Sequence, residues 1–217
     1  MNITYLSKDD AKYPESLKDL PIKGIYFCGD LACLNNAVAI IGKRVVTSAV
    51  LKEAFIVGQN VALLGYPVLN GLALGCDTES IKGALSVNGK VVAILPSSID
   101  NIYPSQNKIL AKEIIEKGGC LISPYSKEEK LQKYNFIFRD KMQAALSRKI
   151  ISIYADYDGG TMHTLKYGYA YNKPIGCFSN IKSEGNSYLL SKGKAEIIDD
   201  LSSFVKYEEP TQMSLFT

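Results

Sequence analysis

The sequence predicts an α/β fold: a doubly wound, mainly parallel sheet with helices on both faces. Three observations support this prediction. From residue 37, short apolar runs alternate with longer amphipathic segments over about 140 residues. The runs lack the strict polar alternation of half-exposed strands, which is typical of strands buried on both faces. Glycines follow several of the runs, where each strand should turn into the next helix.

The elements follow one another in order along the chain. The expected strands are 37–41, 66–69, 91–95, 120–123, 149–154 and 174–178. The expected helices are 47–64, 78–86, 104–117, 135–147 and 161–171. Thr47 or Ser48 can cap the first helix and Asp77 the second, while Pro104 suits the first turn of the third. The segment 174–178 is the last clear strand.

Three regions are expected. Residues 1–36 are interrupted by prolines and form an N-terminal extension packed on the main domain. Residues 37–205 form the main α/β domain, and residues 206–217 form a flexible, solvated tail.

The composition narrows the class of protein. The 217 residues are 47% hydrophobic and 22% charged, which is typical of a globular chain. The net charge is only +3, so any affinity for nucleic acid must come from local clusters of basic residues. The chain starts without a signal-like segment and has no apolar run long enough for a membrane span, so we expect a cytoplasmic protein. Cys28 and Cys33 have no second pair to complete a metal site.

Five glycines fall at expected junctions between strands and helices: Gly42, Gly71, Gly75, Gly159 and Gly160. In a parallel sheet these junctions gather at one edge, where helix N-termini favour anions. Glycine there lets the backbone approach a phosphate closely; the alternative is that it only permits tight turns and close packing. Because neither a G-x-G-x-x-G fingerprint nor P-loop spacing is present, the sequence indicates no cofactor and no catalytic site.

Basic residues accompany these glycines. Lys43 and Arg44 follow the first expected strand, and Arg139 and Lys141 lie in the segment YNFIFRDKM. Arginine binds phosphate through two hydrogen bonds, and aromatic rings interleaved with basic residues suit single-stranded nucleic acid. The alternative is an ordinary amphipathic helix with its phenylalanines in the core.

Six stretches resemble, in order, the successive motifs of the DprA/Smf DNA-processing family: AVAIIGKRVVT, GYPVLNGLALGCDTESIKGAL, NGKVVAILPSSIDNIYPSQNKIL, FIFRDKMQAALSRKIISIYA, GGTMHT and SEGNSYLLSKGKAEII. With YPESLKDLPIKGIYFCG, the resemblance covers about residues 13–205. It implies a Rossmann-like domain and a binding protein, not an enzyme. The family binds and protects single-stranded DNA, helps to load RecA during natural transformation, and usually forms homodimers.

The family motifs map onto this chain residue by residue. The G-[ST]-R turn is similar to Gly42–Arg44, S-G-x-A-x-G-x-D to Asn70–Asp77, and F-x-x-R-N to Phe136–Asp140. The resemblance and the glycine pattern together suggest these DNA-binding residues: Gly42, Lys43, Arg44, Asn70, Gly71, Gly75, Arg139, Lys141, Gly159 and Gly160.

The chain departs from the family pattern at several positions. Lys43 replaces a small residue, Asn70 a serine, and Glu79 with Ser80 the usual Ala-His. Asp140 replaces an asparagine, and this added carboxylate weakens anion binding unless Arg139 or Lys141 neutralises it. These changes indicate a divergent member of the family.

Two further patterns leave alternatives open. DGGTMHT resembles the motif of LOG-type phosphoribohydrolases but has His163 where a catalytic glutamate is wanted, so the alternative function is a nucleotide-derivative sensor or nucleotide-modifying enzyme. The tail segment Gln212–Phe216 resembles the peptide that binds the replication sliding clamp, with Gln212, Leu215 and Phe216 as contacts. A chance match in a short tail explains it equally well.

Overall fold

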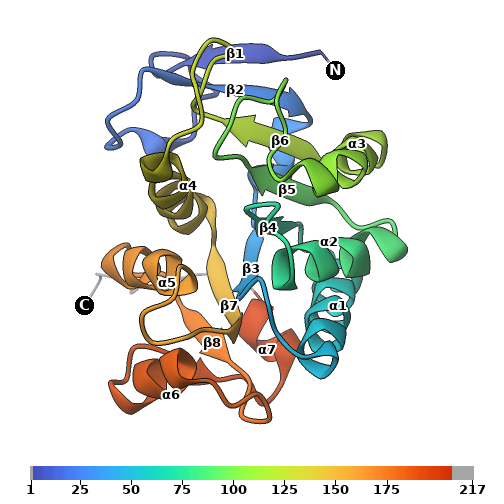
Figure 1. Cartoon of the computed structure of the whole chain (residues 1–217), viewed down its shortest axis with the longest axis vertical. Helices are drawn as coiled ribbons and strands as arrows, with labels where there is room; N and C mark the ends of the chain where they lie inside the picture. The colour runs from blue at the N-terminus through green and yellow to red at the C-terminus, as the bar shows by residue number, and fades with distance from the viewer. Residues whose placement is uncertain (1, 207–217) are drawn as a thin grey trace, which may run out of the picture.

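One sheet of nine strands runs through residues 2–206, the part of the chain that this computed structural model describes (Figure 1). The strands are β1 (Thr4–Ser7), β2 (Gly24–Gly29), β3 (Val38–Gly42), β4 (Val68–Asn70), β5 (Val91–Ile94), β6 (Cys120–Ser123), β7 (Lys149–Tyr154), β8 (Ile175–Cys177) and β9 (Glu196–Ile197). Their order across the sheet is β1-β2-β6-β5-β4-β3-β7-β8-β9. Across the sheet, every neighbouring pair from β6 through β5, β4, β3, β7 and β8 to β9 is parallel, which confirms the predicted α/β class.

The chain winds in two directions from β3. It passes outward through β4 and β5 to β6, then returns to the other side of β3 at β7 and continues outward to β9. The carboxyl ends of β3 and β7 therefore lie side by side where the winding reverses. Such reversal points are where open α/β sheets bind ligands.

The first 36 residues contribute two strands to this same sheet. β1 pairs with β2, and β2 pairs with β6, both antiparallel. Leu6 and Ile25 of these strands are buried in the core. In Figure 1 this antiparallel end of the sheet lies at the top, beside the N-terminus.

Helices cover both faces of the sheet. They are α1 (Ser48–Leu63), α2 (Cys76–Ser86), α3 (Lys108–Glu116), α4 (Lys133–Leu146), α5 (Thr161–Ala170), α6 (Glu184–Ser191) and α7 (Leu201–Val205), with short 3-10 turns η1 (Glu15–Leu17), η2 (Leu31–Leu34) and η3 (Ser105–Asn107). α1, α2, α3 and α7 lie on one side, and α4, α5 and α6 on the other (Figure 1).

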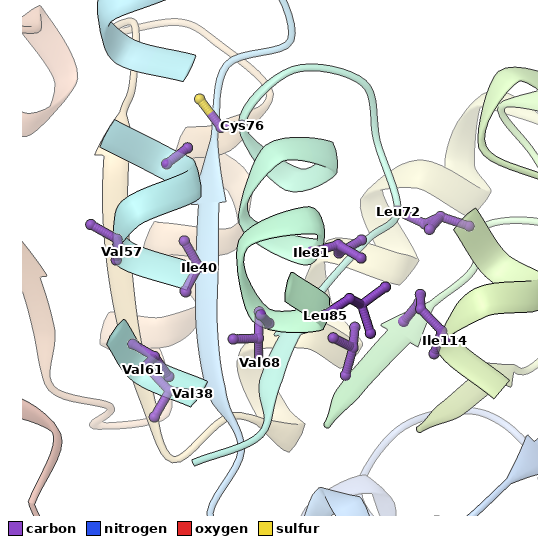
Figure 2. Packing of buried hydrophobic residues seen from close by; sticks show 14 of the residues in the cluster. Val38, Ile40, Val57, Val61, Val68, Leu72, Cys76, Ile81, Leu85 and Ile114 are labelled. Carbon is purple, nitrogen blue, oxygen red and sulfur yellow. The ribbon is translucent and has the colours of Figure 1, made fainter. Parts of the chain in front are cut away.

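Side chains on the two faces of the buried strands pack into two hydrophobic cores, one on each side of the sheet. Val38 and Ile40 belong to the core under α1 and α2, and the alternating residues Ala39 and Ile41 belong to the core under α4 and α5. Figure 2 shows the first of these cores, in which Val57 and Val61 of α1 lie beside the β3 side chains. Because both faces are covered, the strands read as continuous apolar runs.

Two glycines let α1 and α2 touch through their backbones. A Cβ on Gly58 would lie 2.1 Å from the carbonyl oxygen of Ser80, and one on Gly83 would lie 2.0 Å from that of Phe55. No larger residue fits at either position, so the two helices pack at a set distance. This packing fixes the start of α2 and the loop before it, where the candidate site lies.

Some expected boundaries were wrong. α2 begins at Cys76 with Gly75 as its N-cap, so Asp77 lies inside the first turn and does not cap the helix. The helix expected over 104–117 begins as a 3-10 turn and becomes α-helical only at Lys108. β9, α6 and α7, which follow the last predicted strand, were missed because they are short.

Candidate functional site

The loops after β3 and β7 are tied together at the reversal point of the sheet. The backbone N–H of Lys43 donates to the carbonyl of Tyr154 at 3.0 Å, and Lys43 Nζ lies 2.7 Å from Oδ2 of Asp156. This ion pair raises the pKa of Lys43 and holds its charge beside a carboxylate. Lys43 therefore offers less net positive charge than its position in the sequence suggested.

A cavity of about 380 Å³ opens beside these loops. It brings together four of the residues singled out in the sequence: Gly42, Arg44, Arg139 and Gly160. They come from β3, the loop after it, α4 and the start of α5. The expectation that strand-to-helix junctions gather at one edge therefore holds for Gly42 and Gly160, whereas Arg139 comes from the middle of α4.

Arg139 is buried between two carboxylates. Its side chain is 7% exposed, with Nη1 3.9 Å from Oδ2 of Asp77 and Nε 3.0 Å from Oδ1 of Asp140. The Nε contact lacks hydrogen-bond geometry, so it acts as an ion pair. The positive charge of Arg139 is therefore largely compensated by carboxylates within the protein.

Gly71 provides the space for this arginine. A Cβ built on Gly71 would lie 1.3 Å from Nη1 of Arg139. The missing side chain is thus replaced by a guanidinium group and not by open space. This differs from the interpretation that Gly71 is small in order to admit a phosphate directly.

Asp77 is a buried carboxylate with a raised pKa. Its Oδ2 accepts hydrogen bonds from the backbone N–H groups of Gly71, at 3.0 Å, and Ala73, at 3.2 Å. Burial raises the pKa of Asp77 to about 6, against the opposing effects of Arg139 and of the two N–H donors. Burial also raises the pKa of Asp140, although Arg139 lowers it. Both carboxylates lie beside Arg139, and Arg44 acts on Asp140 only through a longer-range electrostatic interaction.

Asp77 makes the stability of the protein depend on pH in a predictable direction. Its folded-state pKa, about 6, lies above the ordinary value of 3.8, so the folded state binds this proton more tightly than the unfolded state. Its contribution to stability is therefore fully present below about pH 4 and is lost as the pH rises through about 6. We therefore expect the free energy of unfolding of Asp77→Asn, relative to that of the wild type, to increase by on the order of 1–3 kcal/mol as the pH rises over that range.

Urea unfolding of both proteins at several pH values measures this difference. Asp100→Asn, at an exposed position, is the matched control and should follow the wild type. A free-energy difference between Asp77→Asn and wild type that stays constant with pH contradicts the prediction.

Arg44 is the exposed cation of the site. Its guanidinium lies 5.7 Å from the ring centroid of Phe136, whose ring meets that of Tyr103 edge-on at 5.5 Å. Arg44 forms no ion pair with any residue in the range 2–206. A smaller hollow of about 50 Å³ adjoins the cavity here, with Leu74 and both rings in its wall.

The N-terminus of α5 faces the same cavity. Gly160 is the N-cap residue, and Gly160 and Thr161 both line the cavity. A Cβ on Gly160 would meet nothing within 4 Å. The open space in front of a helix N-terminus, next to Arg44, suits an anionic ligand.

The remaining glycines and Asn70 support the loops around the cavity. Asn70 is fully buried and donates to the carbonyl of Asp77 and to Oγ of Ser80. Gly75 has φ +78°, and a Cβ there would lie 2.2 Å from the carbonyl oxygen of Arg44. A Cβ on Gly42 would lie 2.6 Å from Sγ of Cys76. Asn70 and Gly75 therefore shape the site without opening into it, whereas Gly42 also lines the cavity.

Two other candidates lie elsewhere. Lys141 Nζ sits 5.9 Å from the ring centroid of Tyr167 and is not among the residues that line the cavity. It follows Arg139 by two residues, which on a helix turns it to the opposite side. Gly159 lines a neighbouring hollow with Asp156, Asp158 and Glu184.

The sequence did not single out several residues of the cavity wall. Gln143 is 2% exposed, and its Oε1 has no hydrogen-bond partner within the described chain. Its position seven residues after Phe136 on the same helix was the available signal. His163, the one histidine of the chain, was noted in the sequence within DGGTMHT; it is exposed on α5 and lines the cavity.

Other expectations concern sites outside this cavity. Gln212, Leu215 and Phe216 lie beyond the residues that the structure describes. Within residues 2–206, no cluster of three or more His, Cys, Asp or Glu side chains is arranged to hold a metal ion. No helix in that range combines the length and the apolar character needed to cross a bilayer.

The fold and the site define a Rossmann-like α/β protein with an arginine-lined cavity at the reversal point of its sheet. The family model described as DNA recombination-mediator protein A matches residues 4–208. The chain belongs to this DprA/Smf family of DNA-processing proteins, which confirms the resemblance seen in the sequence.

Curated relatives agree with this assignment. The chain is 31% identical to protein Smf of Borreliella burgdorferi over 72% of its own length and 51% of that protein. It is 25% identical to DNA processing protein DprA of Streptococcus pneumoniae, over 94% of this chain and 78% of that one. The chain spans about half the length of the curated Smf proteins that it matches.

Solved structures show the same fold. DNA processing protein A of Helicobacter pylori superimposes with a TM-score of 0.81 at 30% identity and covers 94% of both chains. That structure is described as revealing a single-stranded DNA binding mode of the Helicobacter protein. DprA of Streptococcus pneumoniae gives a TM-score of 0.83 at 24% identity, which supports the fold alone.

Proposed function

We propose that this protein binds single-stranded DNA at the cavity beside β3 and β7 and acts in DNA processing and recombination. The observation that carries the proposal is Arg44, an exposed cation next to the N-terminus of α5 and to two aromatic rings. Membership of the DprA/Smf family supports the same function.

Arg44 is the residue that contacts the phosphate of the DNA in this proposal. Its guanidinium can donate two hydrogen bonds to one phosphate, and the α5 N-terminus adds its positive end. Gly160 leaves the backbone accessible on the cavity side, because a Cβ there would meet nothing within 4 Å. Arg139 then acts mainly by setting the charge balance of the cavity, because Asp77 and Asp140 flank it. Such phosphate contacts position single-stranded DNA without recognising its base sequence.

The bases have an apolar surface next to the phosphate site. Phe136 and Tyr103 are in edge contact, and Leu74 and Ile137 are exposed beside them. Stacking of a base on an aromatic ring stabilises binding by about 1–3 kcal/mol per base and tolerates any sequence.

Fluorescence anisotropy of a labelled oligo-dT tests the proposal. We expect wild-type binding to weaken between about 50 mM and about 200 mM salt, as phosphate contacts require. Arg44→Ala should bind about tenfold more weakly, and its salt slope should fall by about 1.

Lys52→Ala is the matched control, because it also removes one positive charge but from the exposed surface of α1. It should bind like the wild type. If Arg44→Ala and Lys52→Ala bind equally well, Arg44 is not the phosphate contact. If the folded wild type does not bind oligo-dT at all, single-stranded DNA is not the ligand.

A second candidate is a nucleotide-derivative sensor or a nucleotide-modifying enzyme. The cavity volume, about 380 Å³, falls within the range of small-molecule sites, and the unpaired Oε1 of Gln143 can accept a hydrogen bond from a base. A thermal shift with single nucleotides, absent with oligo-dT, favours this candidate.

The resemblance also supports finer proposals about partners. We expect a cytoplasmic homodimer that engages RecA, and a tail that binds the sliding clamp through Gln212, Leu215 and Phe216. Light scattering of the purified protein measures the dimer. Binding assays with purified RecA and purified clamp, with Phe216→Ala as the tail variant, measure the two partners.

A further inference from the structure

A second groove, of about 460 Å³, lies at the antiparallel end of the sheet. It runs between β1 and β2 on one side and the start of α4 on the other, and Figure 1 shows α4 below these strands. Five aromatic rings line it: Tyr5, Tyr26, Tyr125, Tyr134 and Phe138. Two of these rings are well exposed, Tyr134 at 62% and Tyr5 at 49%, and Tyr5 also packs against Tyr26 with ring centroids 4.9 Å apart.

Helix α4 connects this tyrosine groove with the cavity. Tyr134 and Phe138 are one turn apart and face the groove, whereas Phe136 and Arg139 face the cavity on the opposite side of the helix. The helix with its side chains is only about 10 Å across, so the two sites are close neighbours.

The surface between the two sites is open and partly basic. Lys133 is exposed at the first turn of α4, and Ile137 is 43% exposed at the second. Their positions on the helix fall between the two aromatic sides. A single strand of DNA that crosses the outer face of α4 therefore contacts a cation and an apolar side chain between the two sites.

The charges around the groove are compatible with a polyanion. Lys23 lines the groove, and the segment 127–133, KEEKLQK, holds three lysines against two glutamates. Glu129 also lines it, and its Oε2 accepts a hydrogen bond from the backbone N–H of Ser126 at 2.6 Å. The local sum is positive, so bases can stack on the rings while the phosphates stay near the lysines.

We infer that the tyrosine groove is a second stacking subsite for the same single strand, which leaves the cavity across α4 and places further bases on Tyr134 and Tyr5. This inference rests on the proposed function of the cavity. Tyrosine suits the task because its ring offers a large flat surface and loses little side-chain entropy on binding. The subsite lengthens the DNA segment that one protomer holds without adding sequence preference.

Oligonucleotide length separates the two sites. An oligo-dT of about 5 nucleotides should occupy the cavity alone, and one of about 20 nucleotides should reach both. We expect Tyr5→Ala and Tyr134→Ala each to weaken binding of the long oligonucleotide by about fivefold to tenfold and to leave the short one unchanged. Tyr134→Phe keeps the ring and should bind both like the wild type.

Tyr169→Ala is the matched control, because this tyrosine is also 49% exposed but lies at the end of α5, away from the groove. It should change neither affinity. If Tyr5→Ala and Tyr134→Ala leave the long oligonucleotide unaffected, or weaken both lengths equally, the subsite is refuted. In the first case the groove is free to serve a protein partner. If the wild type binds neither length, the proposed function itself fails.

Discussion

Gly71→Ala is expected to lower the free energy of unfolding by about 3 kcal/mol, a large share of the stability of a domain this size. The new Cβ would lie 1.3 Å from Nη1 of Arg139, so the buried guanidinium has to move away from Asp77. A displaced arginine leaves a buried carboxylate with less of its counter-charge, and surrounding side chains cannot relax far in a close-packed interior. Urea unfolding followed by circular dichroism measures the loss.

Gly160→Ala is the matched control for this substitution. It makes the same chemical change at a glycine that lines the cavity next to the hollow of Gly71, but the new Cβ meets nothing within 4 Å, and φ at this position is −57°. We expect an effect below about 1 kcal/mol. Equal losses from the two substitutions would show that Gly71 is not specifically required to seat Arg139.

Arg139→Met is expected to cost about 3–5 kcal/mol near neutral pH. Methionine fills much of the space of the arginine stem but carries no charge, so Asp77 and Asp140 lose the cation between them. Without Arg139 the pKa of each carboxyl rises further, because this arginine is the largest cause that lowers both. The stability loss should therefore shrink as the pH falls from about 7.5 to about 5 and the carboxylates become protonated.

Two variants check the cause of this loss. Adding Asp77→Asn and Asp140→Asn to Arg139→Met should recover most of the stability at neutral pH, because no buried charge is then left unpaired. Arg44→Met removes an exposed arginine and should change stability by less than about 0.5 kcal/mol. A loss from Arg139→Met that does not depend on pH, or that the two asparagines do not relieve, refutes the ion-pair explanation.

The sequence predicted the sheet well because buried strands carry a local signal. The expected segments 120–123 and 149–154 coincide with β6 and β7. The same reasoning brought Gly42, Arg44 and Gly160 to one edge, since the carboxyl ends of parallel strands meet there. It failed for β9, α6 and α7, whose two to eight residues are too few for a clear period.

The roles of the basic residues were harder to read. In the sequence, Arg44 follows Gly42, while Arg139 and Lys141 lie in YNFIFRDKM, and nothing local separates the three cations. In the structure, Arg139 is buried beside Asp77, Lys141 lies over Tyr167, and Arg44 alone of the three is an exposed cation at the cavity. The departure at Asp140 matters for the same reason, because its carboxylate sits 3.0 Å from Arg139.

The amino-acid sequence by itself determined the α/β class, the order of most strands and helices, and membership of the DprA/Smf family. These properties depend on periods and motifs that are read over a few neighbouring residues. Only the tertiary structure decided which charge stays available, why Gly71 has no side chain, and how Tyr5 and Tyr134 come to share one groove. Each of these depends on residues far apart in the chain, because burial and charge compensation are set by spatial neighbours.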